Sequence, residues 1–331
     1  MHHATVYRDA YRLAYRVVLR GFWMSEKIAR LKKFLTTRGK GVSLFMAMFV
    51  GIFMPQAHRY AFLIQHLLMV MLFFAFLDID LKPRPSQKGV LWILLANISI
   101  AFAAYALLAP FNLQLALAAF LTAISPTAIS SPVIVSFVEG DMEYIIASVL
   151  LTNIAVALII PFALPALTGT AMQISILDVL QSVVVVMFVP LLLAQLVKKM
   201  PEGGQSFLRK GKSLSMPLWL LTLFIVSAKA SEFLRNENTA SLATLGIIAL
   251  VSLVICILNF GVGVLLGRPD RWRESGQALG QKNLSFTIWV ALTFVNPLVA
   301  MGPMFYIIYH HIYNSWLIYH FEKTRTALME T

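Results

Sequence analysis

Apolar runs of membrane-spanning length recur along most of the chain and restrict its fold more than any other feature. They lie near 41–57, 61–77, 89–109, 113–138, 143–167, 175–197, 214–230, 241–266, 274–296 and 299–319. A helix needs about 20 apolar residues to cross a bilayer, and it satisfies its own backbone groups there. Only 13% of the residues are charged, whereas soluble domains carry roughly 25%. The sequence therefore predicts an all-α polytopic membrane protein with ten transmembrane helices.

The basic residues indicate how these ten helices are oriented. If the N-terminus is cytoplasmic, 23 of the 27 Lys and Arg residues fall in cytoplasmic segments, and Arg59, Lys229 and Arg235 fall in outer loops. The last one, Lys282, lies inside a span. Because cytoplasmic loops are enriched in Lys and Arg, we expect both termini in the cytoplasm and assign the chain to a bacterial inner membrane. Aromatic residues near span ends are interpreted as interfacial anchors: Trp92, Trp219, Tyr306 and Tyr319.

Residues 1–40 hold ten of the basic residues and precede the first apolar run. Arginine recurs at positions 8, 12, 16 and 20, a spacing that places it on one face of a helix. We expect a basic amphipathic arm that lies on the anionic lipids of the cytoplasmic leaflet; a solvated arm is the alternative. This distribution explains the net charge of +12 without a nucleic acid partner.

Two of the apolar runs contain polar, helix-breaking segments near their middle. The fourth run contains SPTAISSP (residues 125–132), and the ninth contains GQKNLS (residues 280–285). Ten spans divide into two halves of five, and an odd number gives the halves opposite orientations, so the two breaks occupy corresponding positions of an inverted repeat. A break in hydrocarbon persists only where protein, water or a solute satisfies the freed backbone groups. We therefore expect two inverted five-helix repeats whose broken spans 4 and 9 form a transport site.

The chain also resembles the bile acid:sodium symporter (BASS) family across essentially all ten spans. The similarity is carried by PTAISSPV (126–133) in the fourth span, EGDME (139–143) after it, Ser148 and Thr152 in the fifth, and ALGQKN (278–283) in the ninth. The resemblance implies one transporter domain over 41–331, in which a panel of spans 1, 2, 6 and 7 faces a core of spans 3–5 and 8–10. Spans 4 and 9 would cross at their unwound centres. Core movement would then carry an organic anion, bile-acid-like or a small carboxylate, by alternating access.

Members of the family bind two sodium ions near this crossing, and the resemblance implies that the residues of the two sites are retained to different extents. One site is implied by three hydroxyl residues, Ser131, Ser148 and Thr152. In the other, Asn97 takes the place of a glutamine. Three positions depart from the family pattern: Pro132 replaces an asparagine, Ala278 replaces the glutamate shared by both sites, and Lys282 replaces a glutamine. A carboxylate is lost and an ammonium is gained, which argues against ordinary sodium coupling.

Lys282 is the most informative single residue, because a lysine within a span costs roughly 2.5–3.5 kcal/mol on insertion scales. Three functional interpretations remain open: the ammonium replaces a sodium ion, carries a proton and so couples transport to protons, or pairs directly with an anionic substrate. A fourth is that it snorkels to the cytoplasmic surface. The sequence offers no acidic partner, since Glu274 lies two helical turns away. Because an unpaired buried ammonium is costly, we expect the substrate to be a small organic anion.

The candidate site combines the polar residues of both breaks with those of the flanking spans. They are Ser125, Thr127, Ser130, Ser131, Ser148, Thr152, Asn97, Gln281, Lys282 and Asn283. The sequence has no HExxH or GxSxG motif, and a single cysteine, Cys256, excludes an intramolecular disulfide. We therefore expect a transporter and not an enzyme, with no catalytic residue and no cofactor apart from a coupling Na+ or H+. The alternatives are a sodium-coupled organic anion symporter and a cation/proton antiporter of similar fold, a class that relies on buried aspartates.

Overall fold

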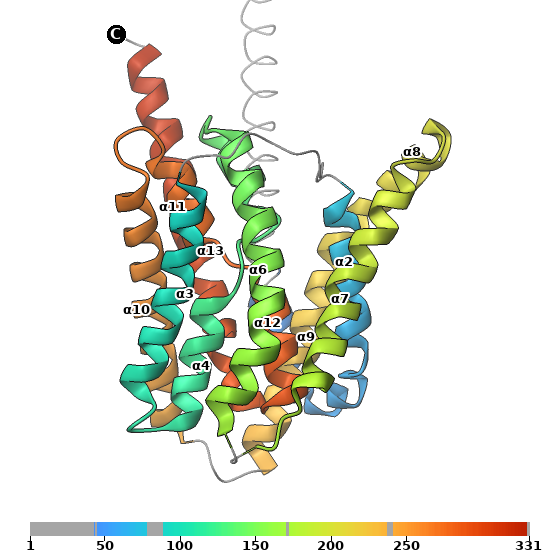
Figure 1. The fold of residues 1–331 in the computed structure, drawn as a ribbon, viewed down its shortest axis with the longest axis vertical. Coiled ribbons are helices and arrows are strands. Elements are labelled where there is room, and N and C mark those ends of the chain that lie inside the picture. The colour runs from blue at the N-terminus through green and yellow to red at the C-terminus, as the bar shows by residue number, and fades with distance from the viewer. Residues whose placement is uncertain (1–42, 44, 78–88, 170–171, 237–240, 330–331) are drawn as a thin grey trace, which may run out of the picture. The chain divides into compact units, whose positions relative to one another are not determined.

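The computed structural model describes residues 43, 45–77, 89–169, 172–236 and 241–329 (Figure 1). The amphipathic arm expected at residues 1–40 lies outside these ranges. The chain divides into two compact units, residues 1–47 and 48–331, and every helix labelled in Figure 1 belongs to the second. All regular elements in the described ranges are helices, as the sequence predicts.

The second unit begins with a short helical segment, residues 48–53. Its first half continues with η1 (Pro55–Tyr60), α2 (Leu63–Phe76), α3 (Val90–Leu108), α4 (Leu113–Ile124), α5 (Ser131–Phe137) and α6 (Met142–Thr168). Its second half contains α7 (Ile176–Val197), α8 (Glu202–Lys210), η3 (Gly211–Leu214), α9 (Ser215–Asn236), α10 (Leu242–Leu266), α11 (Trp272–Gly280), α12 (Leu284–Phe294) and α13 (Pro297–Met329). Several starts are fixed by side chains that accept a hydrogen bond from the first turn: Asn112 for α4, Asp141 for α6, Ser175 for α7 and Ser241 for α10.

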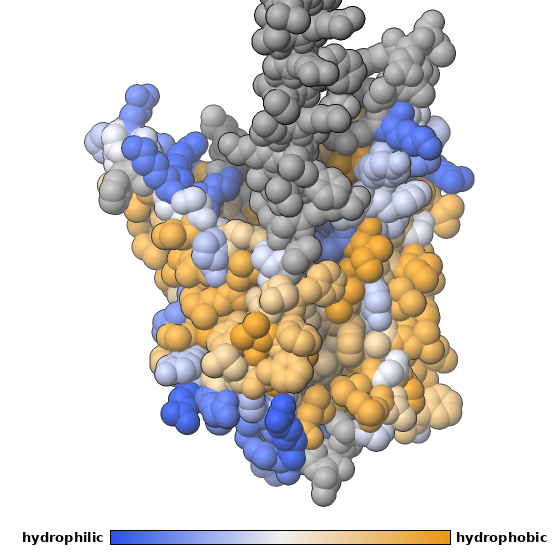
Figure 2. Space-filling view, turned by 180° about the vertical axis from the view of Figure 1, so that it is seen from behind, coloured by the Kyte–Doolittle hydropathy of each residue, from blue (hydrophilic) through white to orange (hydrophobic). Residues whose placement is uncertain are grey.

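Five helical stretches in the described residues are long and apolar enough to cross a membrane. They are α3, α6, α7, α10 and the stretch Glu202–Asn236, which includes α9; the shorter helices α2, α4 and α12 are apolar as well. Figure 2 shows hydrophobic side chains gathered in a broad band, with hydrophilic side chains towards both ends. Some large apolar side chains, such as Leu107 and Leu177, are more than two-thirds exposed at 71% and 68%. Such a surface is stable in lipid and not in water, so the protein is an integral membrane protein.

Both predicted helix breaks are present. The fourth apolar run is divided into α4 and α5 by residues 125–130, and the ninth into α11 and α12 by residues 281–283. Ser125 ends α4 with an extended ψ of 131°, because the following proline disfavours the helical conformation of the residue before it. Gln281 ends α11 with a similar ψ of 107°.

The structure differs from the sequence-based expectation in the connection after α7 and at two helix ends. The predicted linker between the sixth and seventh spans contains α8 and η3. Helix α9 continues to Asn236 and α13 to Met329, because the polar residues that follow both apolar runs are compatible with helix. Lys229, expected in an outer loop, therefore lies within α9, and its ammonium donates a hydrogen bond to the carbonyl of Leu292 at 3.3 Å. Arg235 lies in the last turn of the same helix.

The helices pack in two groups that Figure 1 shows on opposite sides of α6 and α12. In one group α2 packs against α7 and α9. In the other, α3 packs against α4, α10 packs against α11, and α10 and α13 pack against each other and against α4. Glycines permit the closest approaches: a Cβ at Gly263 would lie 2.5 Å from the carbonyl oxygen of Ser275, and one at Gly302 would lie 2.6 Å from the hydroxyl of Thr122. This second group contains α4 and α11, the first halves of the two interrupted spans.

Candidate functional site

The two helix breaks meet and pair through their backbones. Thr127 and Lys282 form an isolated antiparallel bridge. The amide that follows each of them donates to the carbonyl that precedes the other, at 2.8 and 2.7 Å. The two interruptions therefore satisfy backbone groups that would each cost several kcal/mol if left unpaired in a bilayer.

The side chains of the bridged residues then cap the opposite half-helices. The hydroxyl of Thr127 donates to the carbonyl of Ala278 in the last turn of α11 at 2.6 Å. The ammonium of Lys282 donates to the carbonyl of Ala123 in the last turn of α4 at 3.0 Å. Helix C-termini carry partial negative charge, so the ammonium occupies a position that favours a cation.

Asn97 of α3 completes the surroundings of this ammonium. Its side-chain oxygen accepts a hydrogen bond from Lys282, and its side-chain nitrogen donates to the carbonyl of Ile124 at 3.0 Å. Lys282 is only 2% exposed and Asn97 only 1%, so the lysine does not snorkel to the surface. Within the described ranges its partners are an amide and a backbone carbonyl, and no carboxylate pairs with it.

Five of the six hydroxyl residues of the candidate site are buried, Ser130 being exposed, and most of them form hydrogen bonds to a neighbouring helix or to the preceding turn of their own helix. Ser125 shares a hydrogen bond of 2.6 Å with Thr287 of α12. Thr152 of α6 accepts from the amide of Thr127 at 3.0 Å and donates to the carbonyl of Ser148 at 2.8 Å. The hydroxyl of Ser148 donates to the preceding turn of α6 at 2.9 Å. Thr152 thus attaches α6 to the fourth-span break.

Three buried side-chain oxygens near the crossing have no hydrogen-bond partner within the described ranges. Two belong to the candidates Ser131 (Oγ) and Gln281 (Oε1), and the third is Oδ1 of Asn153 in α6. The amide nitrogen of Gln281 donates to the hydroxyl of Ser130 at 3.1 Å, and that of Asn153 donates to the carbonyl of Thr127 at 2.9 Å. Asn283 takes part in the crossing through its backbone amide. Unpaired oxygens beside the crossing are positions at which a solute, an ion or water gains a hydrogen bond or a coordination bond.

These contacts allow the two sodium sites implied by family resemblance to be compared with the residues present. At the second site the ammonium of Lys282 already donates to the Asn97 oxygen, and Ala278 supplies only its carbonyl, which accepts from Thr127. That arrangement does not fit a sodium ion. At the first site three hydroxyls remain, on α5 and on consecutive turns of α6, and α5 packs against α6. Only the hydroxyl of Ser131 among them is unpaired.

Tyr306 of α13 is a member of this polar cluster that the sequence did not indicate. It was expected to be an interfacial anchor but is fully buried at 0% exposure. Its hydroxyl donates to the carbonyl of Gly280 at 2.7 Å, at the end of α11, and accepts from Asn259 of α10 at 3.2 Å. A tyrosine in an apolar run gives no sequence signal for this position, because only the tertiary packing turns it inward.

A second polar network ties the α5–α6 turn to α11 at the end of the bundle that carries α8. Asp141 accepts from the first turn of α6, and its carboxylate lies 3.4 Å from Arg271. The carboxylate of Glu274 accepts a hydrogen bond from the amide of Asp141 at 2.6 Å. It is therefore engaged in this network and does not pair with Lys282. Arg273 donates to the carbonyl of Val138 at 2.8 Å. The network holds the α5–α6 turn, which follows the first break, against α11, which precedes the second.

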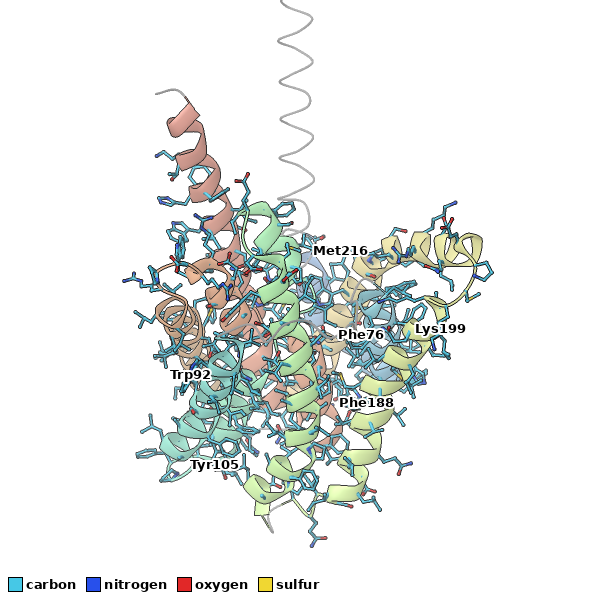
Figure 3. The ribbon with its side chains drawn as sticks, turned by 45° about the horizontal axis from the view of Figure 1, so that its top comes forward. Phe76, Trp92, Tyr105, Phe188, Lys199 and Met216 are labelled. Atoms are coloured by element: carbon cyan, nitrogen blue, oxygen red, sulfur yellow. The ribbon has the colours of Figure 1, made fainter. Side chains whose placement is uncertain are left out.

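A void of about 20 Å³ lies between α2, α6 and α7, beside the residues Phe76 and Phe188 that are labelled in Figure 3. Its lining is apolar except for Asn153, the residue that donates to Thr127 in the break. Asn153 therefore contacts both this void and the fourth-span break.

Crossed, interrupted helices inside an apolar bundle are typical of membrane transporters. Residues 43–313 of the chain match the model of the SBF-like CPA transporter family. The chain belongs to this family, and its predicted resemblance to the bile acid:sodium symporters is confirmed. No curated protein sequence matches the chain.

Proposed function

We propose that the protein is a secondary transporter that carries an organic anion by alternating access, and that Lys282 takes the place of a coupling sodium ion. One observation carries the proposal: the ammonium lies in the crossing of the two broken helices, between the side-chain oxygen of Asn97 and the last-turn carbonyl of Ala123. Neutral oxygens at a helix C-terminus are the ligands that a sodium ion would use. A tethered cation here removes the need for a bound one.

An inverted repeat is supported by the spacing of the helices. The bridged residues Thr127 and Lys282 are 155 positions apart, which is 282 minus 127. The same offset superimposes the ranges of α2, α3, α4, α5 and α6 on those of α9, α10, α11, α12 and α13, respectively. Within this repeat each bridged side chain caps the carbonyl four residues before its partner in the other half. The two breaks therefore have the same pattern of capping hydrogen bonds.

The two packing groups support a division of labour during transport. We assign α2, α7, α9 and the first span to a static panel, and α3–α6 with α10–α13 to a moving core, all within the domain 41–331. The void beside Phe188 lies between these groups, and sliding of the core past the panel would open the crossing to each side in turn. We place the α8 end and both termini in the cytoplasm of a bacterial inner membrane, because described Lys and Arg residues concentrate there: Lys198, Lys199, Arg209, Lys210, Lys212, Arg268, Arg271, Arg273 and Lys323.

An anionic substrate is supported by the donors at the crossing. Helix α12 begins there, and its first residue is preceded by Asn283, whose side chain caps none of the first-turn amides. Such amides carry partial positive charge and bind carboxylates readily. The positive charge of Lys282 adds to this potential.

Sodium symport is the second candidate, favoured by the unpaired hydroxyl of Ser131 beside α6. The two candidate functions are distinguished by measuring the thermal unfolding of the purified protein in a sodium titration at constant ionic strength, with choline as the replacement ion. We expect no sodium-dependent rise in Tm for the wild type and a rise for Lys282→Gln, which restores a neutral amide. Sodium at ten times its Kd stabilises by about 1.4 kcal/mol.

Lys229→Gln is the matched control, because it also removes a lysine whose ammonium donates to a last-turn carbonyl, that of Leu292 in α12. We expect it to remain insensitive to sodium. A clear sodium shift in the wild type would show that the ion is still bound and that Lys282 does not replace it. If sodium is excluded, uptake into vesicles driven by a pH gradient distinguishes a titrating lysine from a permanently charged one.

A further inference from the structure

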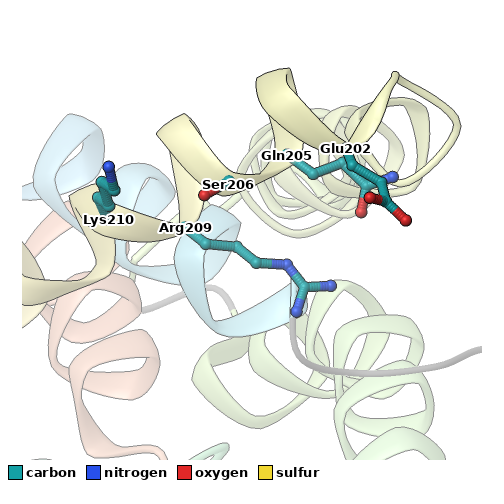
Figure 4. Close-up of a pocket in the computed structure, with 5 residues that line it drawn as sticks. All are labelled: Glu202, Gln205, Ser206, Arg209 and Lys210. Atoms are coloured by element: carbon teal, nitrogen blue, oxygen red, sulfur yellow. The ribbon is translucent and has the colours of Figure 1, made fainter.

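Helix α8, in the connection between α7 and α9, presents a polar face that the transport site does not use. The residues Glu202, Gln205, Ser206, Arg209 and Lys210 line a shallow, open depression of about 420 Å³ (Figure 4). Their spacing of three, four and seven residues places most of them on one side of the helix. Figure 4 shows the guanidinium of Arg209 extending away from the helix axis.

This helix is held firmly to three neighbours. The amide nitrogen of Gln205 donates to the carbonyls of Lys198 and Met200 at 3.0 and 2.8 Å, which fixes α8 to the end of α7. At its other end α8 continues through η3 into α9. A Cβ at Gly211 would lie 2.9 Å from the ring of Phe74, so η3 rests directly on α2. Helix α8 is therefore attached to α7 directly and to α2 and α9 through η3.

The exposed charge on this face is mainly basic and has apolar neighbours. Arg209 and Lys210 are exposed, and neither forms an ion pair within the described part of the chain. Glu202 is the one acidic residue of α8. Met200, just before α8, and Leu214, at the end of η3, are exposed by 44% and 53%. Basic side chains next to exposed apolar ones, a few residues beyond the end of a membrane-length helix, match the chemistry of the lipid headgroup region.

We propose that the basic face of α8 binds the headgroup of an anionic phospholipid and anchors the helix at the membrane surface. The guanidinium of Arg209 donates to the phosphate, and the ammonium of Lys210, which points to another side of the helix in Figure 4, adds to the positive potential. Met200 and Leu214 lie at the two ends of the α8–η3 segment and contact acyl chains. Because α8 is bonded to the end of α7 and leads through η3 into α9, the bound lipid holds these helices still while the core moves. This last role rests on the proposed transport function, whereas headgroup binding does not.

The test is native mass spectrometry of the full-length protein in detergent, titrated with phosphatidylglycerol or phosphatidylcholine. A basic residue at an anionic surface is worth about 5-fold in affinity, so Arg209→Gln/Lys210→Gln should weaken one phosphatidylglycerol site by about 25-fold. The matched control is Arg268→Gln/Lys323→Gln, which removes the same charge from two other exposed positions. Glu202→Gln should retain the lipid, and the arm 1–40 is intact in every variant.

We expect the α8 double variant to lose one bound phosphatidylglycerol at a concentration that saturates the wild type, with its Tm in phosphatidylcholine unchanged. Equal retention by this variant and the wild type would overturn the proposal. So would an equal loss in the Arg268/Lys323 control, because the attraction would then be non-specific. Inorganic phosphate that displaces the lipid at equal concentration would assign the site to a free anion instead.

Discussion

The contact between Lys282 and Asn97 predicts a measurable coupling between two nearly isosteric substitutions. Asn97→Leu removes two hydrogen bonds, one to Ile124 and one from the ammonium. A neutral bond contributes about 0.5–1.5 kcal/mol and one to a charged group about 1.5–3 kcal/mol, so the single variant should lose about 2–4.5 kcal/mol. Lys282→Met loses the same charged bond and the bond to Ala123, but it also removes the desolvation cost of a buried ammonium.

Both single variants lose the ammonium–amide bond, and this bond is the only one that they share. The stability lost by the double variant should therefore be about 1.5–3 kcal/mol smaller than the sum of the two single losses. At about 2 °C per kcal/mol for a large chain, its Tm should lie about 3–6 °C above the additive value. Tryptophan fluorescence during heating in detergent provides the readout. Asn97→Leu combined with Lys229→Met should be additive, since Lys229 bonds to Leu292. Additivity within about 0.5 kcal/mol for the Lys282 pair would refute the contact.

Three further predictions concern the elements that hold the crossing. Gly263→Ala should destabilise the protein by about 1–3 kcal/mol, because its Cβ would lie 2.5 Å from the carbonyl oxygen of Ser275. Gly261→Ala, in the same helix, should be neutral or slightly stabilising, because no atom lies within 4 Å of its Cβ. Thr127→Val should lower stability by about 1–3 kcal/mol through the unpaired α11 carbonyl, and Thr127→Ser should not. Asp141→Ala should cost about 1–2 kcal/mol by removing the cap of α6, while Asp141→Asn, which keeps an accepting oxygen, should cost less than about 1 kcal/mol.

Each of these is checked by Tm in one detergent, and each has an outcome that contradicts its reasoning. Equal Tm values for the two glycine variants would mean that α10 and α11 are not in contact at Gly263. Equal loss for valine and serine at position 127 would attribute the effect to something other than the hydroxyl. Equal loss for alanine and asparagine at position 141 would assign the stability to the pair with Arg271 and not to the cap.

The helix breaks were predictable because they depend on local chemistry. Pro126 and Pro132 interrupt the fourth run, and a cluster of glycine, amides and lysine interrupts the ninth, whatever the rest of the chain does. Lys282 was identified for the same reason, since a lysine within an apolar run is conspicuous in the sequence. The capping bonds were less predictable, because they join residues about 150 positions apart.

What the sequence could not provide is the direction in which a side chain turns. Asn97 and Lys282 were both expected at the site, but their hydrogen bond depends on how α3 packs beside the crossing. Tyr306 was placed at the interface because tyrosine is common there, whereas in the structure it is buried and its hydroxyl bonds to Gly280 and Asn259. Helix α8 was missed because Gly203 and Gly204 in a short polar stretch are typical of a loop. Its helical form depends on the bonds that Gln205 makes to the end of α7.

The pairing of the two breaks through backbone atoms has an evolutionary consequence. Since the bridge at Thr127 and Lys282 uses amides and carbonyls that every residue except proline possesses, the scaffold of the crossing tolerates a change of side chain at position 282. A glutamine codon becomes a lysine codon by one base substitution. Under the proposed function, a lineage with this architecture exchanges an ion taken from solution for a charge carried on its own chain in a single mutational step, and the backbone bridge between the two breaks is retained.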